Sequence, residues 1–105
     1  MLKFILAFHG GKSFETKEQG AEHMKKWRDW TTSLDDAIVD PGMPISTSKT
    51  VSSSGVINDG GSNPLSGITI IQANDIEEAV KMAEKCPHID IGGTIEVAQA
   101  MQIEM

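Results

Sequence analysis

Three histidines, His9, His23 and His88, are the residues of this chain best suited to moving a proton near neutral pH. His23 lies in a segment with helical periodicity, and two aspartates, Asp36 and Asp40, follow that segment. A histidine that acts as a general base needs an acceptor, usually a carboxylate, to fix its tautomer. The sequence therefore suggests that His23 transfers a proton while one of the two aspartates orients it.

Of the two aspartates, Asp40 is favoured because it stands between Val39 and Pro41, where the backbone is held rigidly. Asp36 has a simpler explanation, since it can complete the end of the preceding helix in solvent. His23 also has a structural alternative: it lies at the edge of an apolar stripe, hydrogen-bonded or partly solvated. Both interpretations of His23 stay open at this point.

Four further residues are candidates for ligand binding. His9 ends an apolar strand, and the two glycines after it would let a ligand approach the backbone or simply form a turn. Lys49 stands among serines and threonines, where it would either hold a carboxylate or phenolate or protect a sheet edge. Trp27 and Trp30 would line a cleft for an aromatic ligand, or belong to the core, as tryptophans at helical spacing usually do.

Other kinds of chemistry have little support in the sequence. The pair Cys86-x-His88 is a poor zinc site, because zinc needs three or four ligands, and nothing in the spacing of the histidines requires them to converge on a metal. Cys86 is expected at a helix C-terminus, where the dipole raises its pKa. The chain contains no P-loop, GxGxxG or GxSxG motif. We expect no metal and no cofactor.

The composition limits the classes of partner. With 105 residues the chain is expected to form one domain, and its net charge of −6 argues against nucleic acids and anionic membranes as partners. The single cysteine suits a reducing compartment. The apolar start is short and is predicted to be a strand, not a signal peptide, and no apolar run approaches the length of a membrane span. We expect a cytoplasmic location.

The apolar and turn patterns predict four strands and two helices. In chain order they are a strand over 2–9, a helix from Lys17 to about Leu34 behind a Thr16 cap, a strand over 45–57, a strand over 67–73, a helix capped by Asn74 or Asp75 and ended by Pro87, and a strand over about 94–104. Residues 35–44 are predicted to be a connection, because two prolines and a glycine exclude a helix, and 58–64 a turn.

Apolar periodicity assigns a buried face to three of these elements. The expected sets are His23, Trp27, Trp30 and Leu34 in the first helix; Ile76, Ala79, Val80 and Ala83 in the second; and Ile95, Val97, Met101 and Ile103 in the last strand.

The order β-α-β-β-α-β predicts an α+β, ferredoxin-like fold with an antiparallel sheet. Right-handed crossovers give the strand order 4-1-3-2 in chain numbering, which places the two most apolar strands, 2–9 and 67–73, at the centre. Two helices can cover only one face of such a sheet, yet both central strands are apolar on both faces. We therefore expect a homodimer in which two copies pack sheet against sheet.

The chain resembles YCII-related proteins, on the side of that family that includes the DGPF-domain proteins. The shared features run along nearly the whole chain: His9-Gly10-Gly11, Trp27-x-x-Trp30, Pro44, Ser48-Lys49-Thr50-Val51, Asp59-Gly60, Leu65-x-Gly67, Cys86-Pro87 and Gly92-Gly93-Thr94-Ile95-Glu96-Val97. The DGPF tetrapeptide is absent, because Asp59-Gly60 is followed by Gly61-Ser62. The chain therefore resembles a neighbouring branch.

The resemblance implies a dimeric α+β barrel and, for some members, a helix-1 histidine with a nearby aspartate in a cleft. Most members are uncharacterised, and a few act in the degradation of chlorinated aromatics. Two functions follow as hypotheses. One is a cofactor-independent enzyme that transfers a proton on a small cyclic or aromatic molecule. The other is a protein of the same fold that binds a small molecule, or serves a partner, without catalysis.

Overall fold

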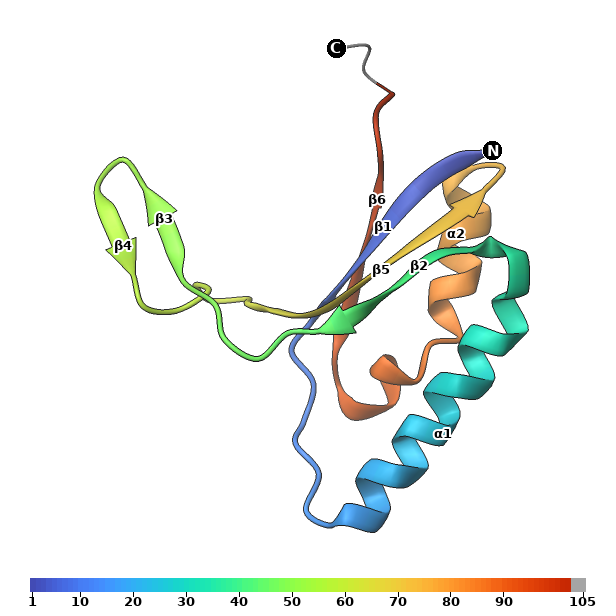
Figure 1. Cartoon of the computed structure of the whole chain (residues 1–105), viewed down its shortest axis with the longest axis horizontal. Helices are drawn as coiled ribbons and strands as arrows, with labels where there is room; N and C mark the ends of the chain where they lie inside the picture. Colours follow the sequence, from blue (N-terminus) through green and yellow to red (C-terminus); the bar gives the residue numbers. More distant parts are fainter. Residues whose placement is uncertain (103–105) are drawn as a thin grey trace.

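The computed structural model describes residues 1–102, which form a four-stranded sheet, two α-helices and a separate hairpin (Figure 1). In chain order the elements are β1 (Leu2–His9), α1 (Lys17–Leu34), the 3-10 helix η1 (Asp35–Ala37), β2 (Ile38–Pro44), β3 (Thr50–Ser52), β4 (Gly55–Ile57), β5 (Leu65–Ala73), α2 (Ile76–Glu84), the 3-10 helix η2 (Pro87–Ile91) and β6 (Thr94–Gln99). Neither helix of the described residues is long and apolar enough to cross a membrane.

The main sheet has the strand order β2-β5-β1-β6, and every neighbouring pair is antiparallel. Its two central strands, β1 and β5, correspond to the apolar segments 2–9 and 67–73 that were predicted to lie at the centre. The prediction of an α+β chain with a four-stranded antiparallel sheet and two helices is confirmed.

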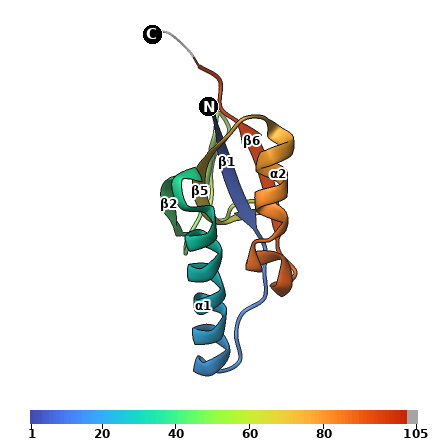
Figure 2. The same cartoon turned by 90° about the vertical axis from the view of Figure 1, so that its right-hand side faces the viewer.

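Both helices pack on one face of this sheet (Figure 2). Alternate residues of β1 and β5 point into the resulting core, as expected for the two-residue period of a strand. The buried apolar side chains are Phe4, Leu6, Phe8, Trp30, Ile71, Ala73, Ala79, Ala83 and Cys86. The intervening residues of the central strands are only half-buried, and no element of residues 1–102 covers them.

Helix α1 has the predicted limits and the predicted apolar face. The Thr16 hydroxyl accepts a hydrogen bond from the Gln19 amide at 3.1 Å, which satisfies one of the free N–H groups of the first turn. The Gln19 side chain accepts in return from the backbone of Glu15 at 3.0 Å. His23 and Trp30 are buried along this face.

Helix α2 is capped by Asp75, whose carboxylate accepts from the Glu78 amide at 2.8 Å. Its predicted stripe is correct only in part: Ala79 and Ala83 are buried, but Ile76 and Val80 are each 37% exposed. The two alanines bring the helix close to the sheet, and Met82, in place of Val80, packs against the core. Sequence periodicity identified the buried side of the helix correctly but made the buried stripe too wide.

The edge strand lies in a different segment from the one predicted. Residues 38–44, expected to be a connection, form β2, and residues 45–57, expected to be the edge strand, do not join the main sheet. Strand β2 pairs only with β5 and carries two register shifts, so its prolines need not donate to a second neighbour. Gly42 adopts φ +70 against the backbone of Ile68, where a Cβ would not fit.

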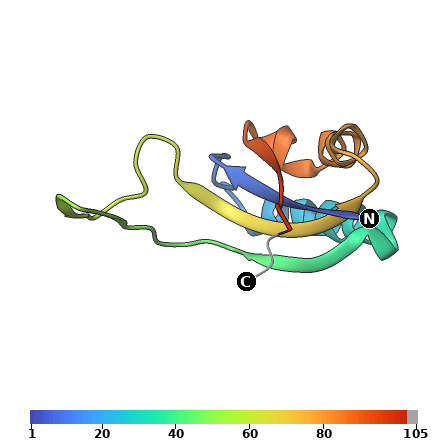
Figure 3. The ribbon, with the colours of Figure 1, turned by 90° about the horizontal axis from the view of Figure 1, so that it is seen from above.

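Residues 46–64, here called the arm, leave the sheet at the end of β2 and return at β5. They carry the hairpin β3–β4 and extend away from the layers of sheet and helices (Figures 1 and 3). In the last strand, β6, Ile95 and Val97 pack against the core as predicted, whereas Met101 is 81% exposed. Ile103, also assigned to that face, lies outside the described residues.

His88 fixes η2 against the end of β1. Its ring Nε2 donates to the carbonyl of His9 at 2.9 Å, and the ring meets Phe8 edge-on with centroids 5.5 Å apart. The backbone of η2 is held as well, because the Lys12 amide donates to the carbonyl of Ile91 at 2.9 Å. The ring also lies against Gly93, where a Cβ would collide with it. Gly93 therefore makes room for the histidine that positions η2.

We predict that Gly93→Ala destabilises the chain through His88. Forcing a methyl group into a filled space typically costs about 1–3 kcal/mol. The penalty should nearly vanish when His88 is also replaced by alanine, because the colliding ring is then gone. Urea unfolding of the parent, both single variants and the double variant measures this coupling. Strictly additive effects would show that Gly93 does not act through His88.

Candidate functional site

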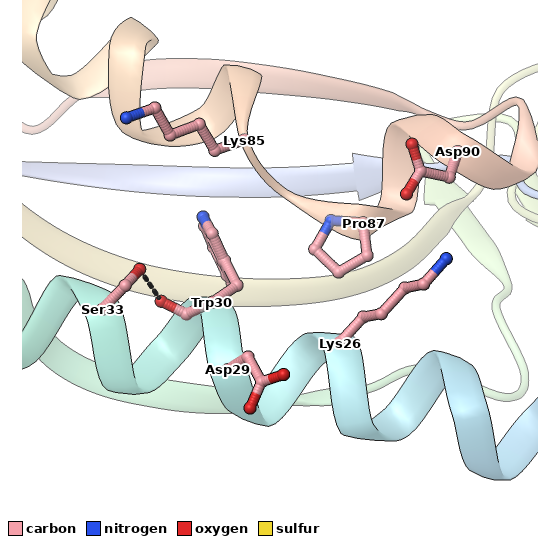
Figure 4. Close-up of a pocket in the computed structure, with 7 residues that line it drawn as sticks. All are labelled: Lys26, Asp29, Trp30, Ser33, Lys85, Pro87 and Asp90. Carbon is pink, nitrogen blue, oxygen red and sulfur yellow. Dashed lines mark hydrogen bonds between the residues drawn. The ribbon is translucent and has the colours of Figure 1, made fainter.

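Two shallow hollows lie along the seam between α1 and η2. The first, with a volume of about 330 Å³, is lined by Lys26, Asp29, Trp30, Ser33, Lys85, Pro87 and Asp90 (Figure 4). The second, with a volume of about 310 Å³, is lined by Lys12, Ser13, Phe14, Gln19, Glu22, His23, Lys26, Asp90 and Ile91. Because Lys26 and Asp90 belong to both, the hollows adjoin and form one groove.

His23 is the only predicted catalytic residue that lines this groove. Helix α1 places it two turns after the cap, on the apolar side of the helix. The ring is buried, packs at a tilt against Phe14 with centroids 4.9 Å apart, and lines the second hollow. Phe14 comes from the segment between β1 and α1, so two elements position the site.

Trp27 determines the protonation of His23. The indole Nε1 donates to His23 Nε2 at 2.8 Å. An indole N–H is only a donor, so Nε2 must supply a lone pair and the neutral ring carries its proton on Nδ1. The nitrogen that a general base would use is therefore already occupied, and Nδ1–H is the group that remains for other partners.

The surroundings of His23 also favour its neutral form. Burial lowers the pKa of His23 below its ordinary value of 6.5, and its electrostatic interactions with His88 and Lys26 lower it further. The carboxylate of Asp90 acts in the opposite direction and raises the pKa. At neutral pH the ring is thus an uncharged hydrogen-bond donor beside a lysine and an aspartate.

The structure does not bring His23 together with Asp40 or Asp36. The Asp40 carboxylate accepts from the Gly42 amide at 2.8 Å within β2, and Asp40 pairs with Ile70, whose side chain belongs to the uncovered face of the sheet. Asp36 contributes its backbone carbonyl to the Gln72 side chain at 2.9 Å. The carboxylate whose charge acts on His23 is that of Asp90.

The other candidate ligand-binding residues lie in different places. His9 is on the sheet, with Nδ1 2.9 Å from the carbonyl of Asn63 and Nε2 3.3 Å from the Glu96 carboxylate. Lys49 is exposed on the arm. Neither lines the groove.

The two tryptophans are mainly core residues. Trp30 is 5% exposed, donates its N–H to the carbonyl of Met82 at 3.0 Å and also lines the first hollow. Trp27 packs edge-on against Phe8 with centroids 5.1 Å apart. The structural interpretation of this pair therefore fits better than an aromatic-binding cleft. Trp27 still bears on the site, through its bond to His23.

Sequence reasoning missed the charged groups of the groove. Lys26 stands three residues after His23 on the same helix, and helical spacing alone was sufficient to place it beside the histidine. Lys12 and Phe14 were not singled out from the sequence. Asp90 had no usable signal, because its position depends on how η2 docks against β1.

Cys86 is buried, and burial raises the pKa of its thiol to about 12. The predicted direction is confirmed, although the main cause is burial and not the helix dipole. Within residues 1–102, no three histidine, cysteine or carboxylate side chains converge as a metal site would require.

No protein-family model matches the chain, and no curated protein matches it either. The function is therefore argued from the groove itself.

We predict that His23 titrates below pH 6.5 with its neutral proton on Nδ1, and that Trp27→Phe raises this pKa by removing the donor to Nε2. Nitrogen-15 shifts of the imidazole ring, followed by NMR against pH, report both properties. A neutral tautomer protonated on Nε2 would contradict the assignment.

The same shift predicts a dependence of stability on pH. Since the folded chain binds the proton of His23 less readily than the unfolded chain, this contribution is complete above pH 6.5 and is lost as the pH falls through and below that value. Urea unfolding should therefore show that the free energy of unfolding falls more between pH 8 and pH 5.5 for the parent than for His23→Gln.

Proposed function

We propose that the chain binds a small molecule in the groove between α1 and η2, without transforming it. The observation that supports this function most directly is the hydrogen bond from Trp27 to His23 Nε2. It occupies the lone pair needed for proton abstraction and leaves Nδ1–H as a donor to a ligand. Binding needs a fixed donor of this kind, whereas base catalysis needs a free acceptor.

The charges of the His23 hollow indicate the class of ligand. Lys12 and Lys26 are balanced by Glu22 and Asp90, and none of these four forms an ion pair with another in the described part of the chain. Phe14 and Ile91 add apolar surface to the same hollow. A small zwitterion with a compact apolar part matches this lining, because it would meet cationic, anionic and apolar groups together.

The second candidate function is the cofactor-independent proton-transfer enzyme. It is favoured by one observation, the neutral His23 at a hollow that also contains Asp90. For His23 to act as a base, Trp27 would have to release Nε2 when the substrate binds. Product formation by the parent chain that is lost in both His23→Gln and Asp90→Asn, with both variants folded, would favour the enzyme over the binding protein.

We also propose that two copies form a homodimer through the uncovered sheet face, giving the ferredoxin-like dimeric barrel that the resemblance to YCII-related proteins implies. On this face the half-buried apolar side chains are Ile5, Ala7, Ile68, Ile70 and Ala98, and the polar Gln72 and Glu96 lie beside them. A monomer that leaves these apolar side chains in water forgoes about 25 cal/mol for each Å² of apolar surface that a partner would bury. A second copy of the same face is the simplest cover, because a two-fold axis would bring the apolar side chains of one copy against those of the other.

For the binding function, we predict that phenylalanine binds more tightly than 3-phenylpropionate or phenethylamine, which each carry only one of its two charges. Chemical-shift titration should map the site to residues of the His23 hollow. Lys26→Gln should weaken binding of phenylalanine up to about fivefold, the range of an exposed ion pair. Lys25→Gln, which removes the same charge one position away and outside the groove, is the matched control.

Equal affinities for the three probes, or shifts that spread evenly over the surface, would speak against a zwitterion site. If none of the three probes shifts any amide of the hollow at millimolar concentration, the binding function is not supported.

For the homodimer, we predict a mass in solution of twice the 11.3 kDa of one chain. Ile70→Lys should reduce it to that of a monomer, since a charge in the middle of the interface loses its hydration. Light scattering at micromolar concentration measures both. Met24→Lys is the control, because Met24 is exposed on α1, away from the sheet. A monodisperse monomer of the parent chain would contradict the dimer.

A further inference from the structure

The arm takes no part in the groove or in the main sheet, so neither accounts for its presence. Its two strands pair only with each other, and every residue of both is exposed. Val51 and Val56 lie directly opposite each other, so their side chains share one face of the hairpin. They are 77% and 61% exposed, respectively. The hairpin therefore presents an apolar pair that no other residue of 1–102 buries.

The base of the arm is nevertheless an ordered structure. The Thr50 hydroxyl donates to the carbonyl of Asp59 at 2.8 Å, which ties the two limbs together. Gly60 lies against Ser48 and Pro64 so closely that a Cβ would crowd both. These contacts join the two limbs of the arm to each other. They do not bury its valines.

A hairpin of this kind has little stability of its own. An isolated two-stranded hairpin is marginally stable in water. The chain as a whole exposes 7628 Å², whereas a compact monomer of its mass would expose about 5,700 Å². Its radius of gyration is 15.1 Å, against about 13 Å for a compact domain of this length. The excess of about 1,900 Å² is more than the roughly 800 Å² that each partner buries in a standard interface.

We propose that the arm packs the Val51–Val56 face onto a second copy of the chain. This inference rests on the proposed homodimer and adds the arm to its interface. In that dimer the two sheet faces cover each other, so the arm would reach past the sheet edge onto the body of the second copy, and a two-fold axis would let both arms engage at once. The arm carries only Lys49 and Asp59 as charged residues, so it is neutral as a whole and is not repelled by a partner of net charge −6. A nucleic acid would instead require a cationic arm.

The test compares two double variants that add the same charge to the arm. Val51→Asp with Val56→Asp places two carboxylates on the proposed contact face, and Ser53→Asp with Asn58→Asp places two elsewhere on the arm. Sedimentation velocity over a concentration series gives the dimer dissociation constant of each. The valine variant should dimerise at least tenfold more weakly than the parent, and the control within threefold of it.

A measurement on a folded dimer removes any dependence on the stability of these variants. A chain without nitrogen-15 carries the spin label on a cysteine introduced by Ser53→Cys, while its own Cys86 is buried and does not react with the label. This chain is mixed with parent chain that is labelled with nitrogen-15 and carries no spin label. Broadening of amide signals from the sheet and helices of the nitrogen-15-labelled chain would support the arm contact.

The outcomes separate the two proposals. A parent chain that is monomeric throughout the series overturns both the dimer and the arm contact. A parent dimer whose dissociation constant is unchanged by the valine variant, and whose body amides are not broadened by the spin label, overturns the arm contact alone. In that case the dimer through the sheet face stands.

Discussion

Two helices cover only one face of the four-stranded sheet, and this constraint shapes the rest of the chain. On the covered face, Phe4, Leu6 and Phe8 pack against the aromatic side of α1, which carries His23 to the edge of the core. On the other face the intervening residues of the same strands are left half-buried. One apolar strand thus sets the surroundings of the histidine on one face and leaves apolar side chains half-buried on the other.

The groove depends on how its two walls are joined. Helix α1 supplies His23 and Lys26, and η2 supplies Asp90, which lies far from them in sequence. The bond from His88 to the His9 carbonyl holds η2 at the end of β1. The groove is thus a consequence of the packing that closes the core, and its histidine is oriented by an indole and not by a carboxylate.

The periodic elements could be predicted from the sequence, because their causes are local. The Thr16 cap, the apolar side of α1, the Asp75 cap and the paired glycines before β6 all act within a few residues of the elements they define. The edge strand could not be predicted, because the prolines of residues 38–44 are tolerated only where one neighbour is missing, and that is a property of the sheet. The pairing of His23 with Trp27 was within reach of helical spacing, whereas Asp90 reaches the site only through the docking of η2.

The central claim is that the uncovered sheet face belongs to an interface between two copies. The most direct test is an isotope-filtered NOE experiment on a mixture of carbon-13-labelled and unlabelled chains. The account predicts intermolecular NOEs to the methyl groups of Ile5, Ile68 and Ile70. Their absence, with the parent chain monomeric at the same concentration, would contradict it.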